Sequence, residues 1–220
     1  MVETALTVVL VAAGRGTRLG GENKVWRTVQ GRPVWWWAAS RFAGRVEAAV
    51  VVVERDRVGD AEAEASSLPF PTSVLQGGEE RSESSAIGLR HVRSPYAAVH
   101  DAARPLVSRE LIDRVLRAAL LTGAAVPGLP AADTVKRVRE GFVLETLPRT
   151  SVVLAQTPQI FRTDWVLEAM AASSGPVTDD VSWLERAGHP VAVVEGERDN
   201  RKITTLEDWQ WLRDHFREAP

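Results

Sequence analysis

The chain has 220 residues, and its 27 Lys and Arg side chains nearly balance 29 Asp and Glu side chains, which leaves a formal net charge of −2. This balance argues against a nucleic-acid binder that works by bulk charge. Cysteine is absent, which excludes thiol catalysis, disulfides and zinc held by cysteine. No apolar run reaches about 18 residues, and the first residues lack the pattern of a secretory leader. We therefore expect a cytoplasmic protein without a membrane segment, folded as one domain over residues 1–220.

The first predicted element is a strand over residues 6–13, with the sequence LTVVLVAA. An almost uninterrupted apolar run is typical of a strand buried on both faces in the middle of a parallel sheet. Residues 14–24 follow, with glycines at four positions and the cations Arg15, Arg18 and Lys24 among them. Glycine lets backbone N–H groups come close to a ligand, and rows of such groups bind anions. This loop is therefore a predicted phosphate site.

The spacing of the loop excludes two familiar kinds of phosphate site. A Walker loop needs a Gly-Lys pair, which the chain lacks. A dinucleotide loop needs glycine where Leu19 stands and an acidic residue about 20 positions further on. The first acidic residue that closes a second predicted strand is Glu54, which lies too far along the chain. The loop therefore does not belong to a nicotinamide-dependent oxidoreductase.

Helices and strands then alternate along the chain. We expect helices over residues 33–43, 56–66, 82–93 and 109–121, the last capped by Ser108, and strands over residues 48–53, 72–75, 96–100 and 124–126, the last stopped by Pro127. Such alternation predicts an α/β fold with a mostly parallel sheet covered on both faces. Ligands of these sheets bind outside the carboxyl ends of the strands. There the chain carries three polar or glycine-rich loops, at residues 14–24, 77–81 and 101–104.

Three consecutive tryptophans, Trp35 to Trp37, fall on the first predicted helix. They point about 100° apart, so one narrow apolar stripe cannot hold all three. We expect them to fill core space, with one of them meeting another element or another subunit. A role in stacking on a base is the alternative.

Residues 133–150 depart from the alternation. Two short strands are predicted over residues 134–138 and 142–147, about a turn at Glu140-Gly141. An isolated two-stranded hairpin is marginal in water, so we predict an arm at a homodimer interface. The alternative is a hairpin that folds back on its own domain. Beyond it we expect strands over residues 152–156 and 191–195 and helices over residues 164–172, 177–186 and 206–216.

Short motifs are spread over almost the whole chain, and their order and spacing are together specific. They are Ala12-Ala13-Gly14-x-Gly16-x-Arg18 with Lys24, Gly77-Gly78-x-x-Arg81 with Ser84, Asp101-Ala102-Ala103-Arg104-Pro105, Asp133-Thr134-Val135-Lys136, Arg149 with Thr157-Pro158-Gln159, Thr178-Asp179 and Asn200-x-Lys202. On these motifs the chain resembles the 2-C-methyl-D-erythritol 4-phosphate cytidylyltransferases. The resemblance implies a Rossmann-like three-layer sandwich with a protruding β-hairpin arm for dimerisation. It also implies an enzyme that joins CTP to a polyol phosphate with Mg2+, in non-mevalonate isoprenoid precursor synthesis.

The resemblance also implies roles for single residues. Arg18 and Lys24 would stabilise the transition state at the α-phosphorus of CTP, while Lys202 and Arg149, the latter reaching the partner's site, would place the substrate phosphate. Mg2+ would be held mainly by the CTP phosphates, with Asp101 as a possible ligand. The nucleotide contacts would come from Ala12, Ala13, Gly14, Gly16, Gly78, Ser84 and Ala102, and the substrate contacts from Asp101, Arg104, Thr134, Thr157 and Thr178. The chain departs from the family at Val25-Trp26 and at Glu79, and neither departure removes a charged catalytic group.

The chemistry is coherent with the residues present. A phosphate monoester has a second pKa near 6 and is largely ionised at neutral pH, so it needs no general base to attack. Such a reaction needs cations that bring two anions together and neutralise the charge on the transferring phosphorus. Two other functions stay open on the sequence alone. One is the same reaction on ribitol 5-phosphate, and the other is a nucleotide-binding regulator without catalysis.

Overall fold

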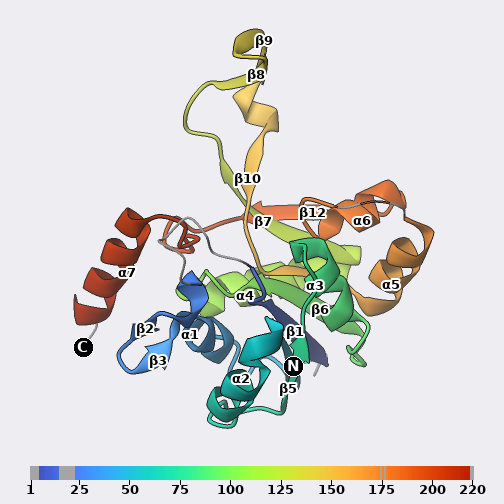
Figure 1. The fold of residues 1–220 in the computed structure, drawn as a ribbon. Coiled ribbons are helices and arrows are strands. Elements are labelled where there is room, and N and C mark those ends of the chain that lie inside the picture. The colour runs from blue at the N-terminus through green and yellow to red at the C-terminus, as the bar shows by residue number, and fades with distance from the viewer. Residues whose placement is uncertain (1–4, 15–22, 174, 176, 219–220) are drawn as a thin grey trace.

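The computed structural model describes residues 5–14, 23–173, 175 and 177–218. Its middle layer is an eight-stranded sheet (Figure 1) in which strands run in the order β5-β4-β1-β6-β11-β7, with β12 and β10 also paired to β7. The parallel strands are β1 (Leu6–Val11), β4 (Ala48–Val53), β5 (Thr72–Gln76), β6 (Tyr96–Asp101), β7 (Ala124–Pro130) and β12 (Ala192–Glu195). The antiparallel strands are β10 (Val153–Ala155) and β11 (Gln159–Arg162).

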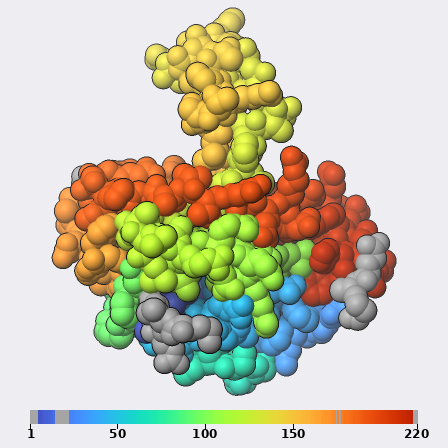
Figure 2. Space-filling view, turned by 180° about the vertical axis from the view of Figure 1, so that it is seen from behind, coloured from blue at the N-terminus to red at the C-terminus, as the bar shows by residue number. Residues whose placement is uncertain are grey.

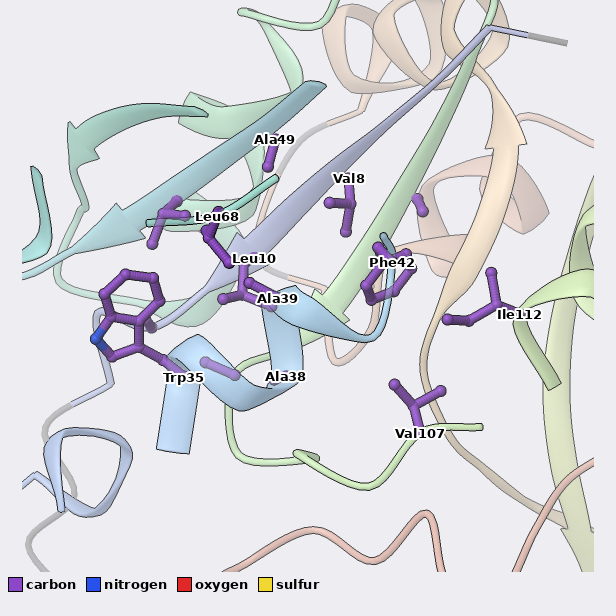
Figure 3. Close-up of a cluster of buried hydrophobic side chains, with 14 of the residues drawn as sticks. Val8, Leu10, Trp35, Ala38, Ala39, Phe42, Ala49, Leu68, Val107 and Ile112 are labelled. Atoms are coloured by element: carbon purple, nitrogen blue, oxygen red, sulfur yellow. The ribbon is translucent and has the colours of Figure 1, made fainter. Parts of the chain in front are cut away.

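Helices cover both faces of this sheet, which confirms the predicted three-layer α/β fold. One face carries α1 (Val34–Ser40), α2 (Val58–Ala65) and α4 (Arg109–Thr122), and the other carries α3 (Arg81–Leu89), α5 (Thr163–Ala172) and α6 (Val181–Arg186). Side chains of β1 alternate between the two cores, since Val8 and Leu10 belong to the first and Val9 to the second. Figure 3 shows Trp35 of α1, and Phe42 just after this helix, gathered with Val8 and Leu10 of β1 in the first core.

A third, smaller core attaches the last helix, α7 (Leu206–Glu218), to one side of the sheet (Figure 1). Phe216 of α7 packs on Trp37 with ring centroids 4.9 Å apart. Trp35 is completely buried, and the indole N–H of Trp36 donates to Ser67 Oγ at 2.8 Å. The tryptophans therefore fill core space and join α1 to other elements, as predicted. The short pieces before α1 are a 3-10 turn, η2 (Lys24–Trp26), and a two-stranded ribbon of β2 (Thr28–Val29) and β3 (Arg32–Pro33).

Two features of the sheet differ from the sequence prediction. β7 continues to Pro130 instead of stopping before Pro127. Pro127 lies between the stretches of β7 that pair with β11 and β10, and its carbonyl still accepts a bond from Gln156 N at 2.7 Å. One missing N–H at this break does not end the strand. β11 was not predicted, and it inserts antiparallel between β6 and β7.

The predicted hairpin is β8 (Val135–Arg139) and β9 (Phe142–Leu147), and it stands away from the rest of the chain (Figures 1 and 2). Glu140 and Gly141 both take positive φ, 52° and 84°, as a two-residue hairpin turn requires. Nearly all of its residues are exposed, so the alternative of a hairpin folded back on its own domain is wrong. Within the described residues, no helix has the length and apolarity needed to cross a membrane.

We expect Gly88→Ala to destabilise the fold by about 1–3 kcal/mol, the range for overpacking a close-packed core. A Cβ at Gly88 of α3 would lie 2.3 Å from Val9 Cγ1 and 3.1 Å from Val52 Cγ2, so the helix could not keep its distance from the sheet. The matched control is Gly59→Ala in α2, where a Cβ would meet nothing within 4 Å. Urea unfolding measures both variants, and equal stabilities would contradict this packing.

Candidate active site

The loops that follow β1 and β5 meet at the carboxyl edge of the sheet. A Cβ on Gly77 would lie 2.5 Å from Ala13 Cβ and 2.7 Å from Ser84 Oγ, so only glycine allows the two loops to approach this closely. The next residue, Gly78, donates its N–H to Ser84 Oγ at 3.2 Å. The predicted nucleotide residues Ala13, Gly78 and Ser84 therefore lie together, and Gly77, which was not among the predicted site residues, joins them.

The last residue of β6 is a buried carboxylate, Asp101, that faces three cations. Arg81 at the start of α3 contacts Oδ1 at 3.0 Å, Lys202 contacts Oδ2 at 2.8 Å, and Arg104 Nε lies 3.7 Å from Oδ2. The Asp101 side chain is 8% exposed, whereas that of Lys202 is 39% exposed. Lys202 is therefore the most exposed cation of this cluster, and its ammonium group can turn toward a ligand.

The charges of this cluster set the protonation of Asp101. Burial alone would raise the pKa of Asp101, because it removes the carboxylate from water. The positive charges of Arg81, Lys202 and Arg104 outweigh that effect and hold its pKa far below the usual range. Asp101 is therefore a carboxylate at every working pH and cannot serve as a proton donor.

A second buried carboxylate, Asp180, also pairs with Arg81. Arg81 Nη2 donates to Asp180 Oδ2 at 2.9 Å, and Ser85 donates its hydroxyl to the other oxygen. Gln159 Oε1 accepts the backbone N–H groups of Asp180 and Val181 at 2.9 and 3.0 Å. These bonds join the start of α6 to α3 and β11. Two carboxylates thus face three cations, and the cluster retains positive charge.

A closed ring of hydrogen bonds lies beneath Asp101. His100 Nε2 is 3.0 Å from the carbonyl of Arg104, and a carbonyl only accepts, so Nε2 carries the proton. His100 Nδ1 then accepts from the Thr157 hydroxyl at 3.0 Å. Arg104 Nη1 donates to the carbonyl of Asn200 at 2.6 Å, and Asn200 Nδ2 donates to the carbonyl of Thr157 at 2.8 Å, which closes the ring. Thr157 Oγ1 also accepts the N–H of Asp101 at 3.0 Å.

The imidazole of His100 is neutral in this ring. It is fully buried, and burial lowers its pKa to about 4. His100 also packs on Phe42 with ring centroids 5.3 Å apart, so it is a packed residue near the end of β6. The ring fixes Asn200, two residues before Lys202, and thereby the segment that carries the lysine.

The other predicted site residues lie outside this cluster. Arg149 and Thr134 are exposed on or beside the arm, where Arg149 Nη1 donates to the carbonyl of Ala132 at 3.1 Å. Thr178 is exposed in the segment before α6. Lys24 is half-buried in η2. In the glycine loop, Ala12 and Ala13 are buried and Gly14 is exposed, while Gly16 and Arg18 lie outside the described residues. Ala102, just after β6, is buried and donates its N–H to the carbonyl of Val11.

The described residues contain no group of three or more His or acidic side chains that could hold a metal ion. Both oxygens of Asp101 contact cations. Mg2+ commonly binds through one or two carboxylates together with substrate phosphates, and keeps several waters. Asp101 could serve as one such carboxylate for Mg2+ held mainly by phosphates, provided that the half-exposed Lys202 turns away from Oδ2.

Sequence reasoning did not select several residues that build this site. Arg81 and Asn200 stood in the motifs but were assigned no role, and Asp180 and Gln159 were also left without one. The signal for Asp180 was its place beside Asp179 at a predicted helix start. The partners of Arg81 lie 20 and 99 positions away, and no local pattern indicates such contacts.

Comparison with known proteins places the whole chain. The family model of 2-C-methyl-D-erythritol 4-phosphate cytidylyltransferase (IspD) matches residues 6–213. The protein of that name from Rhodopirellula baltica is 37% identical, over 93% of this chain and 91% of its own length. The crystal structure of the enzyme from Thermus thermophilus is 32% identical with a TM-score of 0.80, over 97% of this chain and all of that one. The 4-diphosphocytidyl-2C-methyl-D-erythritol synthase of Anaerococcus prevotii has a TM-score of 0.85 at 26% identity, over 98% of this chain and 99% of its own.

Other relatives are longer. The bifunctional enzyme IspD/IspF of Rhodospirillum rubrum is 40% identical over 96% of this chain, which spans 57% of that protein. The chain therefore covers little more than half the length of such relatives.

Lowering the pH should weaken the fold through His100. The imidazole pKa is about 4 in the folded protein and near 6.5 when unfolded, so between these values only the unfolded state binds the proton. Stability is therefore lost as the pH falls, by on the order of 2 kcal/mol between pH 7 and pH 5 for this group. In urea unfolding, the free energy by which the wild type is more stable than His100→Gln should shrink by that amount between pH 7 and pH 5. Parallel pH profiles would contradict a neutral, buried His100.

Proposed function

The chain belongs to the 2-C-methyl-D-erythritol 4-phosphate cytidylyltransferase family, and we propose that it joins CTP to 2-C-methyl-D-erythritol 4-phosphate, giving CDP-methylerythritol and pyrophosphate. This reaction makes an isoprenoid precursor by the non-mevalonate route. The observation that carries the proposal is the cationic cluster around Asp101, at the sheet edge where the nucleotide loops also end. A site of this kind suits the meeting of two phosphate-bearing substrates.

In the proposed reaction a phosphate oxygen of the acceptor attacks the α-phosphorus of CTP. A new P–O bond forms, the bond between the α- and β-phosphates breaks, and its electron pair leaves with pyrophosphate. The dianionic acceptor needs no base, so the neutral, enclosed His100 does not need to take a proton. The protein supplies position and positive charge, with Lys24 acting at the α-phosphorus and Lys202 at the acceptor phosphate.

The cluster also suits the selection of the nucleotide. Ala12 and Ala13 lie beside Gly78 and Ser84 at the carboxyl edge, and the backbone and hydroxyl groups there support recognition of cytosine. Asp101 ends β6, which lies on the other side of β1 from β4 and β5, and its N–H bonds to Thr157. These two residues support contacts to ribose or acceptor hydroxyls. Mg2+ would bind the triphosphate, with Asp101 as a candidate carboxylate, and would add positive charge there.

The arm supports a homodimer in which each arm reaches the partner's site. Arg149 and Thr134 lie beside the arm and make no contact with the Asp101 cluster of their own chain in the bonds described. Apolar side chains remain exposed on the arm, with Phe142 at 76% and Val143 at 59%. Exposed apolar area of this kind is typical of an interface. The use of CTP, a cytoplasmic nucleotide, supports a cytoplasmic location.

One assay tests the reaction and its acceptor. The purified chain is given CTP, Mg2+ and either 2-C-methyl-D-erythritol 4-phosphate or ribitol 5-phosphate, and pyrophosphate release is measured. We expect release with the methylerythritol compound. Release with ribitol 5-phosphate alone would establish the rival acceptor, and binding of CTP without release from any polyol phosphate would establish the regulator.

Lys24→Ala should lower turnover by about 100-fold or more, the usual loss for one electrostatic contact to a developing charge. The same loss is expected for Arg18→Ala from its place in the glycine loop. Arg45→Ala is the control, because Arg45 pairs with Asp113 outside the cluster. Steady-state kinetics at saturating CTP measure the effect. Near-normal turnover of Lys24→Ala with an unchanged melting temperature would remove Lys24 from the mechanism.

We predict that the chain dimerises through the arm and that charged substitutions on the arm prevent this. Sedimentation at micromolar concentration should give twice the mass of one chain for the wild type. Phe142→Asp combined with Leu144→Asp should give the mass of a single chain, because these exposed side chains would bury a charge in the interface. Leu121→Asp, at an 86% exposed position on α4, should leave the dimer intact. A monomeric wild type would contradict the proposal.

A further inference from the structure

Glu54 ties together both ends of the turn that carries Lys24. It follows β4 directly, at the carboxyl edge of the sheet. One carboxylate oxygen accepts from the side-chain amide of Asn23, and the other accepts from the indole N–H of Trp26 at 3.4 Å. Asn23 precedes Lys24 and Trp26 ends the turn. The two residues that the Glu54 carboxylate contacts, Asn23 and Trp26, therefore lie on either side of Lys24 in the turn.

Asn23 passes this restraint to the backbone of the turn. Its Oδ1 accepts the N–H of Val25 at 3.2 Å, and its carbonyl accepts the N–H of Trp26 at 3.0 Å. The amide of Asn23 also lies 3.4 Å from the carbonyl of Ala12, at the end of β1. A lone helical turn of three residues has little stability of its own. The turn η2 therefore depends on these side-chain bonds.

Trp26 anchors the other end to the core. Its ring meets the edge of the fully buried Trp35 at a centroid distance of 5.9 Å. The guanidinium of Arg57, three residues after Glu54, lies over the other side at 5.1 Å. Trp26 belongs to the pair Val25-Trp26 at which this sequence departs from its family. Its bond to Glu54 means that this departure contributes a contact that holds the turn.

We propose that Glu54 is a positioning residue for Lys24. The inference rests on the proposed function, in which the ammonium of Lys24 acts at the transferring phosphorus. A lysine has a flexible four-carbon stem, and its backbone must be held for the charge to be placed well. A misplacement of about 1 Å can lower a rate by up to about 100-fold. Glu54 touches neither phosphate nor base in this scheme and acts only through the turn.

The test is a double-mutant cycle on turnover with CTP and 2-C-methyl-D-erythritol 4-phosphate. Glu54→Ala should lower kcat by about tenfold, within the range for lost positioning, with the KM for the acceptor nearly unchanged. Glu54→Gln, which keeps an oxygen for Asn23, should recover most of that loss. In the Lys24→Ala background, Glu54→Ala should cause less than about a twofold further loss, because coupled residues are not additive. An equal loss in both backgrounds would overturn the proposal.

A second readout does not depend on activity. Hydrogen exchange at the amides of Val25 and Trp26 should be several times faster in Glu54→Ala than in the wild type. Glu64→Ala is the control. It removes a carboxylate on α2 that lies 2.7 Å from Arg32, and it should leave exchange at these amides unchanged. If hydrogen exchange at these two amides is unchanged in Glu54→Ala, Glu54 does not hold the turn, even if turnover falls. A wild type that releases no pyrophosphate would refute the proposed function, and the exchange result would still decide whether Glu54 holds the turn.

Discussion

The site depends on one buried carboxylate that has to be compensated. Asp101 lies at the end of a central strand, where an unpaired charge would be costly, and it obtains Arg81 from α3, Lys202 from the segment before α7 and Arg104 from its own loop. Each of these cations comes from a different part of the chain. The same contacts that stabilise the carboxylate therefore assemble the positive charge that two phosphate substrates need.

Hydrogen bonds tie the surroundings of Asp101 together, and Lys202 is the most exposed of the three cations that face it. His100, Thr157 and Asn200 close a hydrogen-bonded ring below it, and the N–H of Ile203 bonds to the carbonyl of Ala103 at 2.8 Å. The small core under α7 holds this segment from the other side. Lys202 is thus presented from a fixed backbone, while its ammonium stays accessible. Placing reactive groups on well-supported elements is what preorganised catalysis requires.

Sequence reasoning recovered the strands with continuous apolar runs, because β1, β4 and β6 are buried on both faces and carry a strong pattern. It also found the hairpin from its turn residues at Glu140-Gly141. It missed β11, whose four residues QIFR begin and end with polar side chains and obtain their place only by pairing with β6 and β7. The described ends of the predicted loops did meet at one edge, but the partners of Arg81 and those of Glu54 are set by contacts far apart in sequence. The proposed reach of the arm into a partner's site would depend on a second chain, which no pattern within one chain encodes.

We propose that the carboxyl edge of the sheet is the cationic site at which a triphosphate meets a phosphate monoester. A crystal structure of the chain with CTP and Mg2+ tests it most directly. We expect cytosine beside Gly78 and Ser84, with the phosphates between Lys24 and the cluster around Asp101. A nucleotide bound on another face, or one whose phosphates point away from Lys24 and Lys202, would contradict it.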